Sequence, residues 1–309
     1  MLQLRTAGYL ALDNIRARGG FPPRWSGFEE LETVTDNFVE RFREERSVAS
    51  RELGPGYELI ERFDRGVRST ETEHMDSDSI NGKEKLELVR ALDRMNAMTL
   101  GYRHQIDLLD PIVDELSRRR QGPVRVLELA CGSGGLAFAL AGHYLNSSIG
   151  IDVTASDIVP ETVAEGSRRA MECSLPVKFN VMNAFDFAGV EQGSYDLVII
   201  SQSMHHFSPG QLALMIARSE AHGASAFVGL DGYRSLLLLA GVPFVASLQG
   251  MESFTADGLT SARKFYTEVE LDIIAEIATR RKMHRTRSSW PMSMLLVRFD
   301  TNPPVRIST

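Results

Sequence analysis

Cysteine is scarce in this chain, with only Cys131 and Cys173 among 309 residues. Cys131 lies in a glycine-rich turn, so we expect no disulfide framework and a reducing, cytoplasmic location. Long hydrophobic runs are scarce as well. The longest, from Leu236 to Leu248, is interrupted by glycine and proline and is too short for a membrane span. Residues 1–20 carry an aspartate and several arginines and do not resemble a signal peptide.

Positive charge is not in excess either. The chain has 34 Lys and Arg residues against 41 Asp and Glu residues, and its formal net charge is -7. A protein of this charge is not expected to bind nucleic acid or an anionic membrane surface. Hydrophobic residues make up 43% and charged residues 24%, which is typical of a globular protein with a large core.

The stretch from Val124 to Gly135, VRVLELACGSGG, organises the rest of the chain. Its apolar residues run directly into small ones, which predicts a buried parallel strand, a tight turn and the start of a helix. Glu128 stands near the strand end, where ligands bind in open α/β sheets, and would accept hydrogen bonds from an amine or a hydroxyl. Gly132 and Gly134 also fit the pattern of dinucleotide-binding proteins, so an oxidoreductase, or a turn that binds nothing, is an alternative.

After residue 124 the chain alternates between strand and helix patterns. Further strands are predicted at residues 149–157, 177–182, 195–201 and 224–230, and two short ones at 283–287 and 294–299. This alternation predicts an α/β fold, Rossmann-like and doubly wound, with a mostly parallel seven-stranded sheet and helices on both of its faces.

Residues 1–120 are predicted to form an N-terminal helical cap or lid on a domain of residues 121–309. Ser26 to Glu29 reads as a capping box ahead of an amphipathic helix. Another amphipathic helix is predicted over residues 83–100, and a third from Asp110-Pro111, a cap residue followed by proline.

An acidic stretch, ETEHMDSDS, covers residues 71–79 and contains Glu73, Asp76 and Asp78. Carboxylates so close together also occur at metal sites, but such a run is more typical of a solvated loop that caps a helix. We therefore predict no metal ligands in the chain.

The glycine turn resembles the first motif of the class I S-adenosylmethionine-dependent methyltransferases, an acidic residue, two further positions and then Cys/Gly-Gly-Thr/Ser-Gly. The matching residues are Glu128 and the segment 131–134, with Ala130 where that family usually has glycine. The resemblance implies that Glu128, Ala130, Gly132 and Gly134 bind S-adenosyl-L-methionine. It also implies that the last strand runs antiparallel beside the fifth.

A carboxylate at the end of the second strand would bind both ribose hydroxyls of an adenosine. Asp157 and Asp152 are the candidates, and Asp157 is preferred because residues 155–170 resemble the second motif of the same family. The resemblance places Ile158 against the adenine. The alternative is that Asp157 only caps the following helix.

Two other places in the chain match the family. Asn183 and Ala184 follow the third strand, where the family contacts the adenine edge, although Asp186 could supply the polar contact instead. Tyr102 and Arg103 precede the first strand and are expected within reach of the cofactor carboxylate. An arginine suits bidentate contact with a carboxylate, and the alternative is a role in surface or helix packing.

The fourth strand ends at Ser201, an expected cofactor contact. The following His205, His206 and Phe207 resemble the Leu-His-His-Phe motif of small-molecule methyltransferases. Methyl transfer from a sulfonium depends on positioning, but a phenol with a pKa of about 10 must also lose its proton. A histidine with a pKa of about 6.5 can remove it, so His206 or His205 is the predicted catalytic base. A structural role for both is the alternative.

The apolar stretch after the fifth strand, residues 231–254, is expected to lie over the substrate end of the sheet and favours an apolar small-molecule acceptor. Several segments between Glu73 and Val297 resemble bacterial methyltransferases of polyketide and phenolic-lipid pathways. This implies O-methylation of an aromatic or polyketide-derived molecule in secondary metabolism. C-methylation of a quinone-like ring, an oxidoreductase and a non-catalytic binding protein are alternatives, and a homodimer is compatible with each of them.

Overall fold

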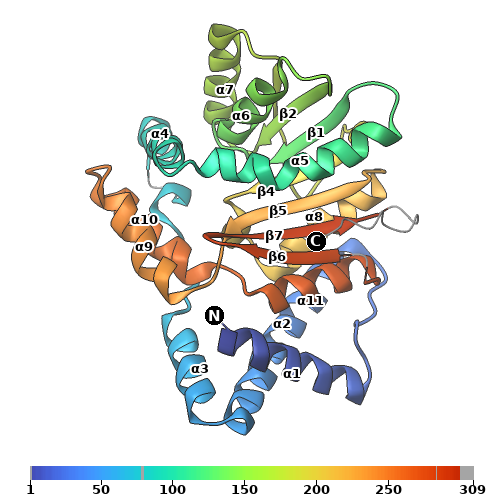
Figure 1. Ribbon diagram of the computed structural model, residues 1–309, viewed down its shortest axis with the longest axis vertical. Helices are drawn as coiled ribbons and strands as arrows, with labels where there is room; N and C mark the ends of the chain where they lie inside the picture. The colour runs from blue at the N-terminus through green and yellow to red at the C-terminus, as the bar shows by residue number, and fades with distance from the viewer. Residues whose placement is uncertain (1, 78–79, 283, 300–309) are drawn as a thin grey trace.

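The computed structural model describes residues 2–77, 80–282 and 284–299 of the chain. Within these residues one seven-stranded sheet has the strand order β3-β2-β1-β4-β5-β7-β6 (Figure 1). The strands are β1 (Val124–Leu129), β2 (Ile151–Asp157), β3 (Val177–Val181), β4 (Leu197–Ser201), β5 (Ala226–Gly232), β6 (His284–Ser289) and β7 (Met292–Arg298).

The first five strands in the sheet order, β3, β2, β1, β4 and β5, pair in parallel. Strand β7 pairs antiparallel with both β5 and β6. This confirms the predicted α/β fold with its mostly parallel sheet and an antiparallel last strand beside the fifth. The order of the strands reverses between β1 and β4, and ligands of open α/β sheets bind beyond the carboxyl ends of the strands at such a point.

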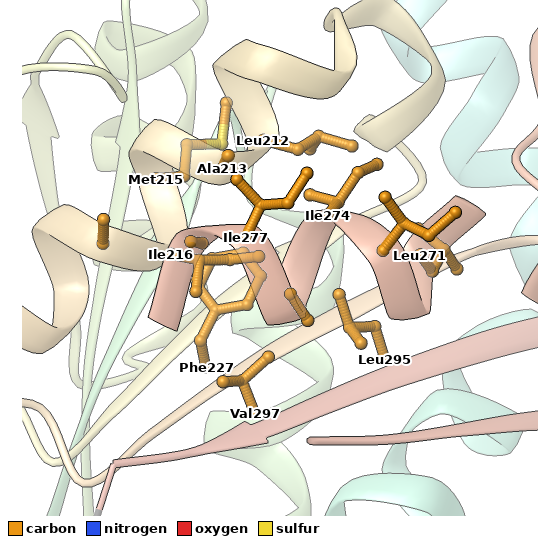
Figure 2. Packing of buried hydrophobic residues seen from close by; sticks show 14 of the residues in the cluster. Leu212, Ala213, Met215, Ile216, Phe227, Leu271, Ile274, Ile277, Leu295 and Val297 are labelled. Carbon is orange, nitrogen blue, oxygen red and sulfur yellow. The ribbon is translucent and has the colours of Figure 1, made fainter. Parts of the chain in front are cut away.

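Each face of the sheet is covered by helices that bury a separate hydrophobic cluster. On one face lie α5 (Gly101–Arg119), α6 (Gly135–Tyr144) and α7 (Pro160–Cys173). On the other lie α8 (Pro209–Ala221) and α11 (Glu268–Thr279). Figure 2 shows Ile274 and Ile277 of α11 in the layer between α8 and the strand residues Phe227 and Val297. β4 is buried from Leu197 to Ile200 because both of its faces are covered.

Three N-terminal helices, α1 (Leu2–Arg18), α2 (Phe28–Leu53) and α3 (Pro55–Val67), lie beyond α8 and α11 (Figure 1). Apolar residues of α1 and α2 belong to the same buried cluster as α8 and α11. The partners of α1 and α2 are α8 and α11, which present apolar side chains away from the sheet, and residues 236–248 are not in this cluster. The domain division at residue 120 stays a prediction.

The run of residues 236–248 packs elsewhere. It contains the whole of α9 (Leu236–Ser247), which lies against α10 (Glu252–Lys264). Through Ala246, α9 shares a small buried cluster with Leu88 of α4 (Gly82–Met98). None of the helices in the described part of the chain combines the length and the apolar character that a membrane span requires.

Two predicted helix starts are wrong. The third predicted helix begins at Gly101 rather than Asp110, and Pro111 lies inside it on an exposed position. Proline lacks the N–H group that would bond the preceding turn of the helix. The packing of buried neighbours such as Leu109 and Ile112 against the sheet offsets this lost hydrogen bond. At α2 the N-cap is Gly27, and Ser26 pairs with Glu30 instead of Glu29.

Candidate functional site

The turn between β1 and α6 contains three residues with positive φ, namely Ala130 at 49°, Gly132 at 54° and Gly134 at 82°. Glycine adopts these angles freely, whereas a residue with a Cβ is strained there by roughly 1 kcal/mol. Ser203 donates a hydrogen bond to the carbonyl oxygen of Ala130 at 3.2 Å and helps to hold this conformation. The hydrogen bond from Ser203, just after β4, therefore helps to offset the strain of having alanine instead of glycine at position 130.

Glu128 lies beneath this turn and is almost fully buried. Its Oε2 atom has no hydrogen-bond partner among the described residues. Burial, together with the charges of Asp93 and Asp157, raises the pKa of Glu128 to about 8 despite a hydrogen bond from the backbone of Ala137. A buried polar atom without a partner is costly, so a bound amine or hydroxyl would be held at this oxygen.

Asp157 ends β2 directly beside the turn. Its Oδ2 accepts a hydrogen bond from the Gly132 N–H at 2.8 Å, and its Oδ1 accepts one from the Val159 N–H at 2.9 Å. Burial raises the pKa of Asp157. The competing candidate, Asp152, is exposed and lies near the opposite end of β2, paired in register with Arg125. The position of Asp157 fits both the helix-capping alternative and the predicted cofactor contact.

The predicted adenine contacts lie at the adjacent strand ends. Ile158 is 62% exposed, which leaves its side chain free to cover a flat ring. Asn183 is exposed and its Oδ1 accepts a hydrogen bond from the Phe185 N–H, while Ala184 packs at the edge of the buried cluster. Phe185 packs edge to face on Phe207, with ring centroids 5.5 Å apart, so stacking on a ligand would require this ring to turn.

The end of β4 is connected to the helices that precede the sheet. The Ser201 hydroxyl donates to Oε1 of Gln105 at 2.6 Å, and the amides of Gln202 and Asn96 exchange two hydrogen bonds of 2.7 Å. Gln202 has a φ of 52°. These contacts place the predicted residue Ser201 on the same side of the sheet as α4 and α5.

Helix α4 closes over the glycine turn through Asp93. This carboxylate accepts hydrogen bonds from the Tyr102 hydroxyl at 2.5 Å, from the Ser133 hydroxyl at 3.1 Å and from Arg169 at 2.9 Å. Tyr102 thus lies at the turn, whereas Arg103 occupies an exposed position of α5, and the predicted contact of both with the cofactor carboxylate stays a prediction. Asp93 belongs to a segment outside every motif. Arg169 lies near the end of the stretch 155–170 that resembles the second motif, but nothing in that stretch singled it out.

His205 and His206 stand together after β4, with ring centroids 4.3 Å apart. The Nδ1 atom of His205 lies 2.9 Å from Asp231, and Nδ1 of His206 lies 2.6 Å from Asp76. Both Nε2 atoms face Glu73, at 3.5 Å for His205 and 3.7 Å for His206. Burial lowers the pKa of His206, but the hydrogen bond to Asp76 and the charge of Glu73 outweigh it, so this pKa is raised.

Glu73 corrects the interpretation of the acidic stretch. It is 2% exposed rather than solvated, and it accepts a hydrogen bond from the Ser261 hydroxyl at 2.9 Å. The short 3-10 helix η1 (His74–Asp76) carries it to the histidines, because Asp257 of α10 accepts the backbone N–H groups at the start of η1. Asp78 lies outside the described residues.

The chain is similar in part to known proteins. Residues 126–222 match a family described as a methyltransferase domain. The chain contains a class I S-adenosylmethionine-dependent methyltransferase domain. Over 119 residues it is 32% identical to a ubiquinone biosynthesis O-methyltransferase of Xanthomonas campestris pv. campestris, which covers 38% of this chain and 47% of that protein. The chain therefore matches about half the length of these curated relatives.

Other relatives of the methyltransferase domain extend the match. A non-reducing polyketide synthase of Stachybotrys chartarum is 26% identical over 207 residues, 65% of this chain and 7% of that protein. The plantazolicin methyltransferase BamL, solved with SAH, covers 79% of this chain and 99% of its own at 13% identity, with a TM-score of 0.54. A candidate O-methyltransferase of Nostoc punctiforme matches 78% of this chain and 67% of its own at 15% identity, with a TM-score of 0.52. The two structures show the shared fold.

The methyltransferase domain thus gathers its predicted residues at one edge of the sheet, around the carboxyl ends of β1, β2 and β4. The positive-φ turn and the unpaired oxygen of Glu128 fit the amine and hydroxyl groups of S-adenosyl-L-methionine. The assignment of each residue to a part of the cofactor stays a prediction.

Proposed function

We propose that this protein is an S-adenosyl-L-methionine-dependent O-methyltransferase acting on an apolar, aromatic or polyketide-derived small molecule. The observation that carries the proposal is the buried, unpaired oxygen of Glu128 beneath a glycine turn within a methyltransferase domain. When bound, the cofactor supplies a methyl group on a sulfonium. The residues proposed to hold it are Glu128, Ala130, Gly132, Gly134, Asp157, Ile158, Asn183, Ala184, Ser201 and Tyr102.

The apolar acceptor is supported by the surface beside the site. Leu237, Phe244 and Leu248, on α9 or at its end, are largely exposed, and α9 packs on α10, which also contacts the histidine segment. Matched relatives named for ubiquinone biosynthesis and for polyketide synthesis fit an acceptor of this kind. C-methylation of a quinone-like ring is the second candidate, since the same apolar surface would suit it.

His205 and His206 are proposed to activate the acceptor oxygen. Their Nδ1 atoms are held by carboxylates, which fixes both rings. Replacement of His206 with alanine should lower turnover roughly 10²- to 10⁴-fold, the usual contribution of a positioned acid–base group. Cofactor affinity should stay nearly constant.

Calorimetric titration with S-adenosyl-L-methionine, S-adenosylhomocysteine, NADH and NADPH tests the proposed cofactor. We expect the first two to bind and the nicotinamides not to bind. Glu128→Ala should weaken binding roughly 10- to 150-fold, as expected when a buried polar group of the ligand loses its hydrogen-bond partner. Asp152→Ala is the matched control, because this carboxylate lies at the other end of the sheet and should leave affinity unchanged.

Incubation with methyl-labelled cofactor and a set of phenols and quinols tests the reaction. The chemical shift of the labelled carbon distinguishes a methoxy group from a ring methyl group. A ring methyl product would favour C-methylation. Tight binding of NADPH without binding of S-adenosylhomocysteine would contradict the methyltransferase proposal.

A further inference from the structure

The cluster of Glu73, His205 and His206 has a geometry that acid–base chemistry alone does not require. One oxygen or nitrogen from each side chain can be chosen so that all three lie within 4.8 Å of one another. The three residues come from two distant parts of the chain, brought together by η1 and the end of β4. We propose that this cluster binds one divalent transition-metal ion of the Zn²⁺ class.

The distances suit such an ion. Nε2 of His205 lies 3.5 Å from Glu73 Oε1, and Nε2 of His206 lies 3.7 Å from Glu73 Oε2. Ligand bonds of about 2.0–2.2 Å in tetrahedral geometry separate neighbouring ligand atoms by roughly 3.4 Å. Both distances between an imidazole nitrogen and a Glu73 oxygen are thus within a few tenths of an ångström of the separation that such an ion requires.

The second observation is the set of carboxylates behind the histidines. Histidines that bind a metal almost always use their other ring N–H to bond a carboxylate, a carbonyl oxygen or a water. Nδ1 of His205 lies 2.9 Å from Asp231, and Nδ1 of His206 lies 2.6 Å from Asp76. Both rings are thereby fixed with Nε2 directed to the same point, next to Glu73.

The charges of the side chains around the cluster also favour a bound cation. Glu73, Asp76 and Asp231 carry three negative charges, and Lys264, 3.5 Å from Glu73, supplies one positive charge. Apart from the two histidines, these groups sum to two negative charges. Glu73 is nearly fully buried, and buried charges are costly unless they are compensated. A divalent cation would supply that compensation, with Lys264 turning outward.

The chemical class of the ion follows from the ligands. Two imidazoles and one carboxylate suit Zn²⁺, Fe²⁺ or Co²⁺ better than Mg²⁺ or Ca²⁺, which prefer oxygen. Three protein ligands also leave a position for an acceptor oxygen, whose pKa such an ion lowers. This last step rests on the proposed function. In the metal-bound form the imidazoles would serve as ligands and not as bases.

Cobalt titration of the full chain tests the site without turnover. The protein is treated with EDTA, dialysed and titrated with Co²⁺ while visible absorption is recorded. We expect one equivalent to bind with the intense bands of a low-symmetry site. Glu73→Gln and His206→Ala should abolish these bands, and Asp231→Asn should lower the affinity about 10- to 100-fold. His143→Ala is the matched control, since His143 forms an exposed pair with Asp110.

A second measurement needs no variant. The ¹H NMR spectrum of the Co²⁺ protein should show two strongly shifted, exchangeable signals, one from the Nδ1–H group of each ligating histidine. Failure of the wild-type protein to bind Co²⁺ or Zn²⁺ at micromolar concentration would overturn the inference, as would a spectrum without the two signals. If the protein transfers methyl groups but binds no metal ion, the metal site is wrong and the proposed function stands. If it binds the ion but transfers no methyl group, the metal site stands and the proposed function is contradicted.

Discussion

Asp157 accepts a hydrogen bond from the backbone N–H of Gly132 at 2.8 Å, so a carboxylate of β2 fixes the turn that follows β1. The other oxygen of Asp157 caps the start of α7 through Val159. One side chain thus sets the relative position of two strand ends and of the helix between β2 and β3. The turn is therefore arranged for a ligand before any ligand is bound.

Gly134 is constrained by packing as well as by its φ of 82°. A Cβ at this position would lie 2.4 Å from the ring of Phe179, which also crowds Gly166. Gly134→Val should therefore lower the free energy of unfolding by about 2 to 5 kcal/mol. Urea denaturation measures this loss.

The double variant Gly134→Ala with Phe179→Leu provides the control for crowding. It should be more stable than Gly134→Ala alone, because the smaller side chain leaves room for the added methyl group. A Gly134→Val protein as stable as the wild type would show that Phe179 moves aside without cost.

Glu128 should make stability depend on pH. Its pKa is about 8 in the folded protein because of burial, and about 4.3 when unfolded. Between these values the folded state holds a proton that the unfolded state has released. The free energy of unfolding should therefore fall with rising pH, by up to about 1.4 kcal/mol per pH unit from this group. Unfolding in urea at pH 5, 6, 7 and 8 measures the slope.

Glu128→Gln is the matched control for that slope. The amide keeps the size of the side chain and does not ionise, so the difference between wild type and variant isolates the contribution of one carboxyl group. Equal slopes for the two proteins between pH 5 and pH 8 would mean that Glu128 is already ionised in the folded state.

Arg46 tests how firmly the N-terminal helices are attached. It is fully buried in α2 and bonds Glu61 and Asp64 of α3, each at 2.8 Å, and Arg234 beyond β5 also contacts Asp64. Arg46→Ala removes the ion pairs that Arg46 makes with Glu61 and Asp64, although Asp64 keeps Arg68 and Arg234. This loss should cost about 3 to 5 kcal/mol of unfolding free energy. Arg18→Ala, which breaks an exposed pair with Glu45, should change stability by less than about 1 kcal/mol.

The sequence could place a candidate site residue in the fold wherever that residue stands at a strand end. Glu128, Asp157 and Ser201 each occupy a strand end, and parallel strands bring such ends to one edge of the sheet. The alternation of strand and helix patterns was sufficient for the fold, because β4 and its neighbours are buried on both faces and read as apolar runs.

The remaining site residues lie in segments whose local pattern is unremarkable. Asp93 sits on an amphipathic helix and Glu73 in an acidic stretch, and only tertiary packing brings them to the glycine turn and to the histidines. Lys264 reaches Glu73 from α10, which is 191 positions away in the chain. Spacing along the sequence carries no information about contacts of this range.

Tyr102 and Arg103 are both predicted from the sequence to contact the cofactor, but they differ in their surroundings in the structure. The Tyr102 hydroxyl bonds Asp93 at the turn, and a Cβ added to Gly135 would lie 1.9 Å from its oxygen, whereas Arg103 is exposed. Tyr102→Phe removes the hydrogen bond that holds Asp93 beside the turn and should weaken S-adenosylhomocysteine binding several-fold, since the turn is then less firmly held. Arg103→Ala should change it less than about twofold. Calorimetry on both variants measures the difference, and a larger loss for Arg103→Ala would mean that α5 turns when the cofactor binds.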